Sequence, residues 1–425
     1  MIIRDGQDKA KININCSGRY NLGILRTGFA IIIVFGTLIF NTGCKNISLQ
    51  PSQILTPSSE VQPDKSKTPS VVESQTTEVT PSPITPPEIS PTEIPTITNI
   101  PTSPLDAPQA ITNLPEGAIA GLKSELESFY DLEINSQGDF LGLAGSMGVL
   151  LYDSETLEFY RILSRDNHYS IAWSPDGDRV AASSFDLISI WDITTGEKDL
   201  KIDKYNFDWV DPPYGMDWST TGFLAISNTA DMGFVDIWDG NKGIVVNQVY
   251  NDQRYHRKDL YYEYYGASSI KWSPGGDSLA CGGSLFNELI VWDQESSSER
   301  YTITTVGSTI RDLDWSPNGK IIASAIWDYL VTLWNVDSGL WNKNIWLPDR
   351  VWSVAWSPDG RTLAVGLEKG LILLYDPETG NKLHQFDGHT DIVSSLDWSL
   401  DGTKLFSASR DGRLLVWKAE EILQP

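Results

Sequence analysis

The stretch VAWSPDGRTLAVG (residues 354–366) decides the fold of this chain. Its apolar side chains alternate with others up to Trp356, which is typical of a strand. The Ser-Pro-Asp-Gly that follows has the composition of a type I turn, because proline fixes φ at the second position and glycine suits the fourth. Further apolar runs follow at residues 362–366, 371–376 and 382–386. One unit is therefore predicted to consist of four short antiparallel strands.

This unit recurs along the chain. The tryptophan stands at Trp173, Trp218, Trp272, Trp315, Trp356 and Trp398, with spacings of 45, 54, 43, 41 and 42 residues. A degenerate unit over residues 132–153 carries Ile134 in the same position. Seven units with a period near 42 and four strands each are the pattern of propeller blades, which bury their faces only by stacking around a ring.

The units resemble WD40 repeats, since their third strands end in IWD (190–192, 237–239), VWD (291–293), LWN (333–335), LYD (374–376) and VWK (416–418). The resemblance covers about residues 115–420, and the unit over 388–417 shows it most fully. In the family, a hydrogen-bonded tetrad of His389, Ser407, Asp411 and Trp417 would hold that blade together. The other units lack the histidine and should depend on tryptophan packing. The fold implied is an all-β, seven-bladed WD40-type β-propeller.

The ring needs a strand from elsewhere to close, because the chain has eight residues left after Trp417. In WD40 rings the N-terminal strand completes the last blade, and residues 118–126 stand in the right place for it. Closure leaves no free sheet edge. We therefore assign residues 113–425 to the propeller.

The first 44 residues resemble an export signal. Arg19 and Arg26 precede an uncharged run, residues 27–40, which is short of the ~20 residues of a bilayer span and fits a signal-peptide core. The following NTGC resembles the lipobox of bacterial lipoproteins, although Asn41 departs from its usual aliphatic residue. We expect lipidation of Cys44 and an exported protein anchored on the extracytoplasmic side of the membrane. An uncleaved N-terminal anchor and a misread start are the alternatives.

Residues 45–112 are predicted to be a disordered stalk. Residues 51–108 hold 13 of the 23 prolines and 19 serines or threonines, and such a segment cannot bury enough apolar surface to fold.

Charge and motifs argue against several functions. The net charge of −24 disfavours binding to nucleic acid. The four histidines form no paired motif, and CxxC, Gly-x-Ser-x-Gly and P-loop patterns are absent from the sequence, so we expect no cofactor, no metal and no enzyme. The alternative is a hydrolase or lyase that uses carboxylates at the central channel. Carboxylates from several blades that converge with perturbed protonation would favour it.

Aromatic residues outside the repeat positions suggest a contact surface. Five of the 16 tryptophans are of this kind, and some share positions with other aromatics in loops that a WD40 ring presents on its narrow face. The predicted partner-binding face comprises Tyr169, Phe185, Trp209, Tyr214, Trp327, Trp346 and Trp352. Such rings could anchor a peptide or a glycan, or could merely fill gaps between blades.

A Tyr-rich, basic insertion at residues 250–266 accounts for the longest spacing and is a candidate recognition loop, or a cover for the adjacent blade. Its candidate residues are Arg254, Tyr255, His256, Arg257, Tyr261 and Tyr262. We therefore expect a monomeric interaction or scaffolding module that binds an unknown protein or peptide. The alternatives are the enzyme above and a glycan-binding module of the cell envelope.

Overall fold

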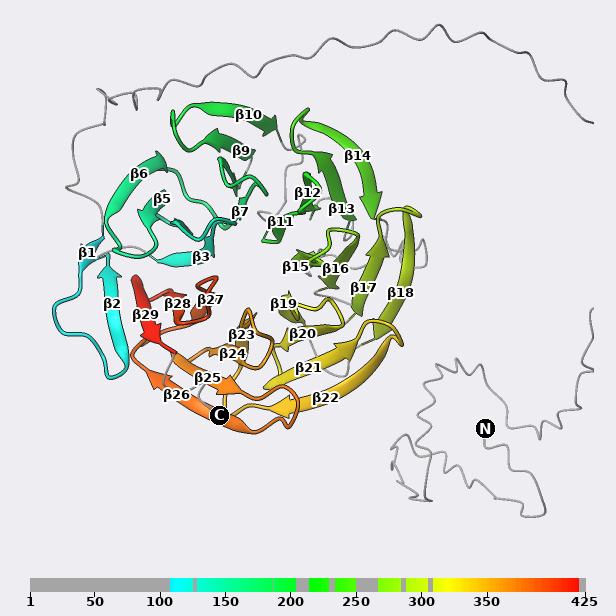
Figure 1. The fold of residues 1–425 in the computed structure, drawn as a ribbon. Helices are drawn as coiled ribbons and strands as arrows, with labels where there is room; N and C mark the ends of the chain where they lie inside the picture. The colour runs from blue at the N-terminus through cyan, green and yellow to red at the C-terminus, as the bar shows by residue number, and fades with distance from the viewer. Residues whose placement is uncertain are drawn as a thin grey trace, which may run out of the picture. The chain divides into compact units, whose positions relative to one another are not determined.

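A computed structural model describes residues 108–124, 128–185, 187–203, 214–228, 234–249, 267–283, 288–304 and 309–419. The 29 elements of these residues are all strands. Within the same residues, no helix has the length and apolar character needed to cross a membrane. The strands form seven sheets arranged as a ring (Figure 1), which confirms the prediction of an all-β, seven-bladed propeller.

Six blades are antiparallel four-stranded sheets of consecutive strands, as predicted. Blade 1 contains β3 (Phe129–Ile134), β4 (Phe140–Gly145), β5 (Gly148–Asp153) and β6 (Phe159–Ser164). Blade 2 contains β7 (Ser170–Trp173), β8 (Arg179–Ser183), β9 (Leu187–Asp192) and β10 (Lys198–Asp203). Blade 3 contains β11 (Met216–Trp218), β12 (Phe223–Asn228), β13 (Phe234–Asp239) and β14 (Ile244–Val249).

Blade 4 contains β15 (Ala267–Trp272), β16 (Ser278–Gly283), β17 (Glu288–Asp293) and β18 (Ser298–Thr304). Blade 5 contains β19 (Ile310–Trp315), β20 (Ile321–Ile326), β21 (Leu330–Asn335) and β22 (Leu340–Trp346). Blade 6 contains β23 (Val351–Trp356), β24 (Leu363–Leu367), β25 (Leu371–Tyr375) and β26 (Lys382–Asp387). Figure 1 shows the first strand of each blade innermost and the fourth at the periphery.

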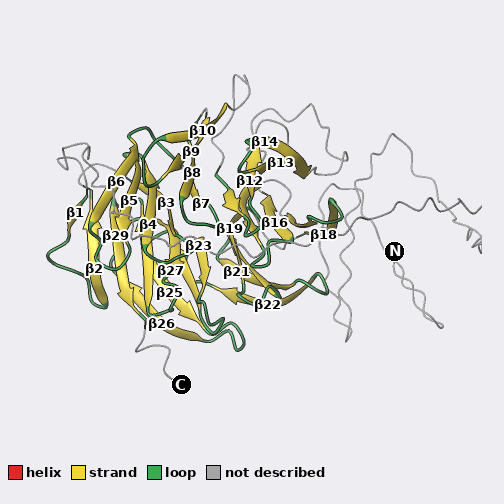
Figure 2. Ribbon diagram, turned by 45° about the horizontal axis from the view of Figure 1, so that its top comes forward, coloured by secondary structure: helices red, strands yellow, loops and turns green. Residues whose placement is uncertain are grey.

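Blade 7 closes the ring with strands from both ends of the described chain. It combines β27 (Val393–Trp398), β28 (Lys404–Ser409) and β29 (Arg413–Lys418) with β2 (Ala118–Lys123). Strands β2 and β29 pair antiparallel, with Leu122 opposite Leu414, and lie side by side in Figures 1 and 2. The prediction that residues 118–126 supply this strand is confirmed for residues 118–123.

A fifth strand of blade 7 was not predicted. Strand β1 (Gln109–Ala110) pairs with β2, with Ala110 opposite Leu122. Strand pairing therefore begins before residue 113, where the sequence placed the start of the propeller. Its sequence gave no sign of this because a two-residue strand is too short for a visible alternation of apolar residues.

The Ser-Pro-Asp-Gly turn forms as its residues predict. The N–H of Gly360 donates to the carbonyl oxygen of Ser357 over 2.8 Å, and the φ of Gly360 is 70°, a left-handed conformation that favours glycine. The Ser357 hydroxyl caps the turn by accepting from the N–H of Thr362 over 2.9 Å. The turn that starts at Ser174 has the same hydrogen bond and ends at Gly177.

The repeated tryptophan ends the innermost strand and is buried between blades. Ile134 takes the same position at the end of β3 and is buried too. Three of the indoles also bond to the preceding blade: the Nε1–H of Trp173 donates to the carbonyl of Glu133 over 2.9 Å. Trp315 donates to the carbonyl of Lys271 over 2.9 Å and Trp398 to that of Ala355 over 3.2 Å. The tryptophan thus packs its own blade and ties it to its neighbour.

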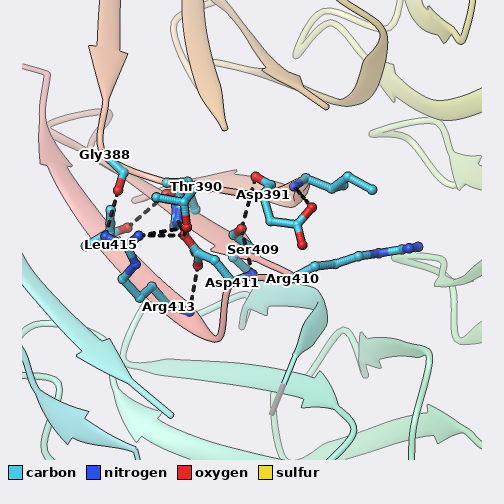
Figure 3. A network of polar contacts seen from close by, with 12 residues as sticks. Gly388, Thr390, Asp391, Ser409, Arg410, Asp411, Arg413 and Leu415 are labelled. Atoms are coloured by element: carbon cyan, nitrogen blue, oxygen red, sulfur yellow. Dashed lines mark hydrogen bonds and ion pairs between the residues drawn. The ribbon is translucent and has the colours of Figure 1, made fainter. Parts of the chain in front are cut away.

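The four residues of the implied tetrad lie together in blade 7. Trp417 Nε1 donates to Ser407 Oγ over 2.8 Å, and His389 Nε2 lies 2.7 Å from the same hydroxyl. His389 Nδ1 lies 3.2 Å from Asp411 Oδ2 and must be the donor, because a carboxylate only accepts. Burial opposes ionisation of Asp411, but the hydrogen bond from His389 brings its pKa down to about 2. Figure 3 shows the Asp411 end of this network, with Arg410 extending away from it.

Candidate functional site

The candidate site lies on the face of the ring at which the innermost strands begin, which we name the leading face. Two positions of the repeat supply seven of the eight residues described below. One is the fourth residue before the end of the innermost strand, as in Trp352 of β23. The other is the twelfth residue after that end, in the loop between second and third strands, as in Trp327. The side chains at these positions meet across blade boundaries.

Rings and guanidinium groups form one continuous stack on the leading face. The array, as we name it, consists of Tyr214, Tyr169, Tyr130, Arg410, Trp352, Arg311, Trp327 and Arg350, in order of contact. The rings of Tyr130 and Tyr169 are parallel, with centroids 5.5 Å apart, and Tyr214 meets Tyr169 edge-on at 5.7 Å. These contacts join blades 1, 2 and 3.

The arginines continue the array through the other blades. The guanidinium of Arg410 lies 6.0 Å from the ring centroid of Tyr130 and 4.9 Å from that of Trp352. Arg311 lies 4.7 Å from Trp352 and 4.8 Å from Trp327, and Arg350 lies 4.8 Å from Trp327. The rings therefore hold three cations on the leading face of an acidic protein.

The sequence identified half of this array. Tyr169, Tyr214, Trp327 and Trp352 were predicted, and the structure brings these four into one set of contacts. Tyr130, Arg311, Arg350 and Arg410 were missed. The signal was present for three of them: Tyr130 and Arg311 share the repeat position of Trp352, and Arg410 shares that of Trp327.

The other predicted partner-binding residues lie outside the array or cannot be placed. Phe185, in the loop between β8 and β9, is 55% exposed, and Trp346, the last residue of β22 at the periphery, is 70% exposed. Neither joins the array through a ring contact among the described residues. Outside the described residues lie Cys44, Trp209 and the candidate loop residues Arg254, Tyr255, His256, Arg257, Tyr261 and Tyr262.

Acidic side chains of the innermost strands form a second cluster, which sequence reasoning raised only as a test of the enzyme alternative. These inner-strand carboxylates are Asp131, Glu133, Asp217, Asp312, Asp314 and Asp397. Among the described residues, Lys271 of β15 is the one cation whose charge acts on all of them, and its Nζ lies 3.4 Å from Asp217 Oδ1. Carboxylates from four blades thus converge around one lysine.

Five of these carboxylates link neighbouring blades through the backbone. Asp397 Oδ2 accepts from the N–H of Ile134 over 2.8 Å, and Asp217 Oδ2 from that of Trp272 over 2.6 Å. The other three such bonds run from Ile171 to Asp131 (3.1 Å), from Val354 to Asp312 (2.9 Å) and from Trp356 to Asp314 (2.7 Å). Because an innermost strand has a free edge, its N–H groups need such acceptors.

The protonation of the cluster is perturbed by burial. Burial raises the pKa of Asp314 to about 7 and those of Asp312 and Asp397 to about 6, against the opposing charge of Lys271. Burial likewise raises the pKa of Glu133 well above its usual value. Partial burial acts to lower the pKa of Lys271, but the negative charges of Asp217 and Glu133 outweigh it and raise that pKa. The single positive charge of Lys271 cannot neutralise all six inner-strand carboxylates.

Carboxylates from several blades thus converge with perturbed pKa values, which was the criterion for the enzyme alternative. Five of them, however, accept hydrogen bonds that join neighbouring blades, and this is a structural role. Glu133 is the exception, because its Oε2 is buried with no hydrogen-bond partner among the described residues. Among the described residues, no group of three or more His, Cys, Asp or Glu side chains is placed to hold a metal ion.

Two segments of the propeller match known repeat families. Residues 299–335, from β18 to β21, match the WD domain, G-beta repeat. Residues 343–401, from β22 to the turn after β27, match the anaphase-promoting complex subunit 4 WD40 domain. These two segments of the propeller are similar to WD40 repeats. The expectation drawn from the third-strand motifs is thereby confirmed for the repeats and the propeller.

The chain is also similar to several characterised proteins. The chain is 25% identical over 297 residues, 65% of its length, to "Cell division cycle 20.1, cofactor of APC complex" of Arabidopsis thaliana, and covers 60% of that protein. It is 25% identical over 178 residues, 42% of its length, to Autophagy-related protein 16 of Arabidopsis thaliana, covering 33%. It is 30% identical over 145 residues, 34% of its length, to "WD repeat-containing protein SL1-17" of Schistosoma mansoni, covering 48%. The chain thus spans less than two thirds of these relatives' lengths.

Proposed function

We propose that this chain is a protein-interaction module whose contact surface is the array on the leading face. The observation that carries the proposal is the continuous stack of rings and guanidinium groups across six blades. Tryptophan, tyrosine and arginine are the residues most enriched where binding energy concentrates in protein interfaces. The relatives support the same role, because Cell division cycle 20.1 is named as a cofactor of a complex.

The array favours a protein over a glycan. A sugar is bound by stacking on an open aromatic face, whereas guanidinium groups lie over the rings of Trp327 and Trp352. The enzyme alternative draws on the inner-strand carboxylates, five of which already accept backbone hydrogen bonds. Binding without catalysis therefore accounts best for the geometry.

Removing two rings of the array should separate binding from folding. We expect Trp327→Ala combined with Trp352→Ala to abolish affinity capture of a protein partner, because truncated hot spots cost ~2 kcal/mol or more each. Both residues are half-buried, so the melting temperature should fall far less than in the control Trp356→Ala, a buried repeat position where truncation costs ~3–5 kcal/mol. A double variant that unfolds like the control would show that these rings are packing.

We also propose that the module works outside the cytoplasm, tethered to the membrane through Cys44. The support is the sequence of residues 19–44, with its two arginines, apolar core and terminal Thr-Gly-Cys. The full chain should incorporate a fatty-acid probe, and Cys44→Ala should remain an unlabelled precursor. A wild-type chain without label would contradict the tether.

A further inference from the structure

Arg410 of the array has N–H donors that its ring contacts do not use. A guanidinium stacked on a ring is held by its flat face, so the stacking satisfies none of its five N–H donors. Arg410 is exposed and lies over Tyr130 and Trp352, and it forms no ion pair with any carboxylate of the described residues. Its donors are therefore oriented by the rings without being consumed by them.

The array already holds one carboxylate. Glu368 lies at the same repeat position as Arg410 and Trp327, and its Oε2 is 3.3 Å from Nη1 of Arg350. Its side chain is 31% exposed and that of Arg350 is 41% exposed, so this pair stands at the surface of the leading face. The chain thus shows, within its own repeats, that an arginine of the array donates to a carboxylate.

Charge narrows the class of ligand further. The chain carries 56 acidic residues against 32 lysines and arginines. An array with three arginines is therefore locally positive on a molecule whose net charge is negative. A long polyanion such as nucleic acid would extend from the array over acidic surroundings and be repelled. A short anionic segment would touch the arginines alone.

We propose that the array binds an acidic peptide segment of a protein partner, with a carboxylate on the guanidinium of Arg410. This inference rests on the proposed function and names its ligand. In it, the rings are positioning groups and the arginines are the contacts: Tyr130 and Trp352 fix the plane of Arg410 so that two parallel N–H donors face the ligand. Arginine and carboxylate match each other in just this forked geometry.

A labelled peptide tests this on the full chain. Fluorescein-labelled hexaglutamate should bind in fluorescence anisotropy, more weakly as salt rises, and hexaglutamine should not. Arg410→Gln should weaken hexaglutamate binding about tenfold, as expected for a lost hydrogen-bonded charge. Arg410→Lys keeps the charge but loses the planar fork, so its affinity for hexaglutamate should lie between those of the wild type and Arg410→Gln.

The matched control is Arg179→Gln. Arg179 also lies over an indole, 5.1 Å from the ring of Trp218, but it begins β8 at the opposite face and donates to the carbonyl of Gly240 over 3.0 Å. Its loss should leave peptide affinity unchanged. Equal affinity for hexaglutamate and hexaglutamine, or equal losses in the two arginine variants, would overturn the proposal.

Two further outcomes are informative. A phosphoserine peptide that binds where hexaglutamate does not would overturn the carboxylate assignment in favour of a phosphorylated ligand. Loss of protein capture in the Trp327 and Trp352 double variant, together with unchanged capture in Arg410→Gln, would overturn the acidic ligand while leaving the interaction module standing.

Discussion

A chain that begins after Leu126 will be largely insoluble, whereas one that begins after Pro108 will melt like the full chain. The longer deletion removes β2 and so exposes the edge of β29 along the register from Ala118 opposite Trp417 to Lys123 opposite Arg413. It also removes Leu122, which is 4% exposed in the core between blades 7 and 1. An open ring presents a free strand edge, which invites aggregation.

Solubility on expression and thermal melting of the two truncated chains check this expectation. The shorter deletion is the control, because it keeps β1 and β2 in place. Equal solubility and equal melting temperatures would contradict closure of the ring by β2.

Lys271→Met will destabilise the propeller by about 3–4 kcal/mol at pH 8 and by much less near pH 5. Breaking a buried ion pair costs ~3–5 kcal/mol, and we take the lower part because the Lys271 side chain is 35% exposed. The inner-strand carboxylates would then stand together without the charge that lowers their pKa values. At pH 5, Asp312, Asp314 and Asp397 are largely protonated, so removing the positive charge of Lys271 costs less stability.

The pH dependence has a definite sign. The pKa of Asp314 is raised to about 7 and those of Asp312 and Asp397 to about 6 in the folded chain, above their usual value near 3.8. The folded state therefore binds more protons, and stability that is present below about pH 4 is lost as the pH rises through 6 to 7. His168 has the opposite effect on the pH dependence of stability. Burial lowers its pKa to about 4, so its protonation in the unfolded chain reduces stability as the pH falls.

Urea unfolding of the wild type and Lys271→Met at pH 5 and pH 8 measures both effects. The variant should show the steeper loss of stability with rising pH. A cost of the substitution that is the same at both values would contradict a cluster held by one lysine. Glu133→Gln is the control, because Glu133 Oε2 has no hydrogen-bond partner among the described residues and its loss should not destabilise.

Much of the fold could be predicted because each blade repeats the same local rules. Three features recur in phase along the chain: the alternation up to Trp356, the turn that ends at Gly360 and the third-strand motif. Each unit is a weak indication of a blade by itself, and seven units with one period predict a propeller strongly. Closure could also be predicted, because a unit that lacks its fourth strand needs one from elsewhere. A short strand such as β1 could not, since pairing of two residues depends on contacts with β2 and leaves no pattern in the sequence.

The candidate site was predicted only in part, for physical reasons. Aromatic residues outside the repeat positions marked the leading face, but their partners are arginines, whose side chains are common at surfaces and draw no notice. Arg410 shares the repeat position of Trp327, but its contact with Trp352 follows only from the placement of the loop after β28. The inner-strand carboxylates were expected only as part of the enzyme alternative and without residue numbers. Their role as hydrogen-bond acceptors for the free edge of the innermost strand is a property of the assembled ring.

Photo-crosslinking on the leading face tests the central claim most directly. Benzoylphenylalanine in place of Tyr214, which belongs to the array and is 45% exposed, should form a covalent adduct with the captured partner. The same group in place of Leu400, which is 53% exposed in the turn between β27 and β28 on the opposite face, should not. Adducts from Leu400 and none from Tyr214 would place the partner on the other side of the ring and contradict the account.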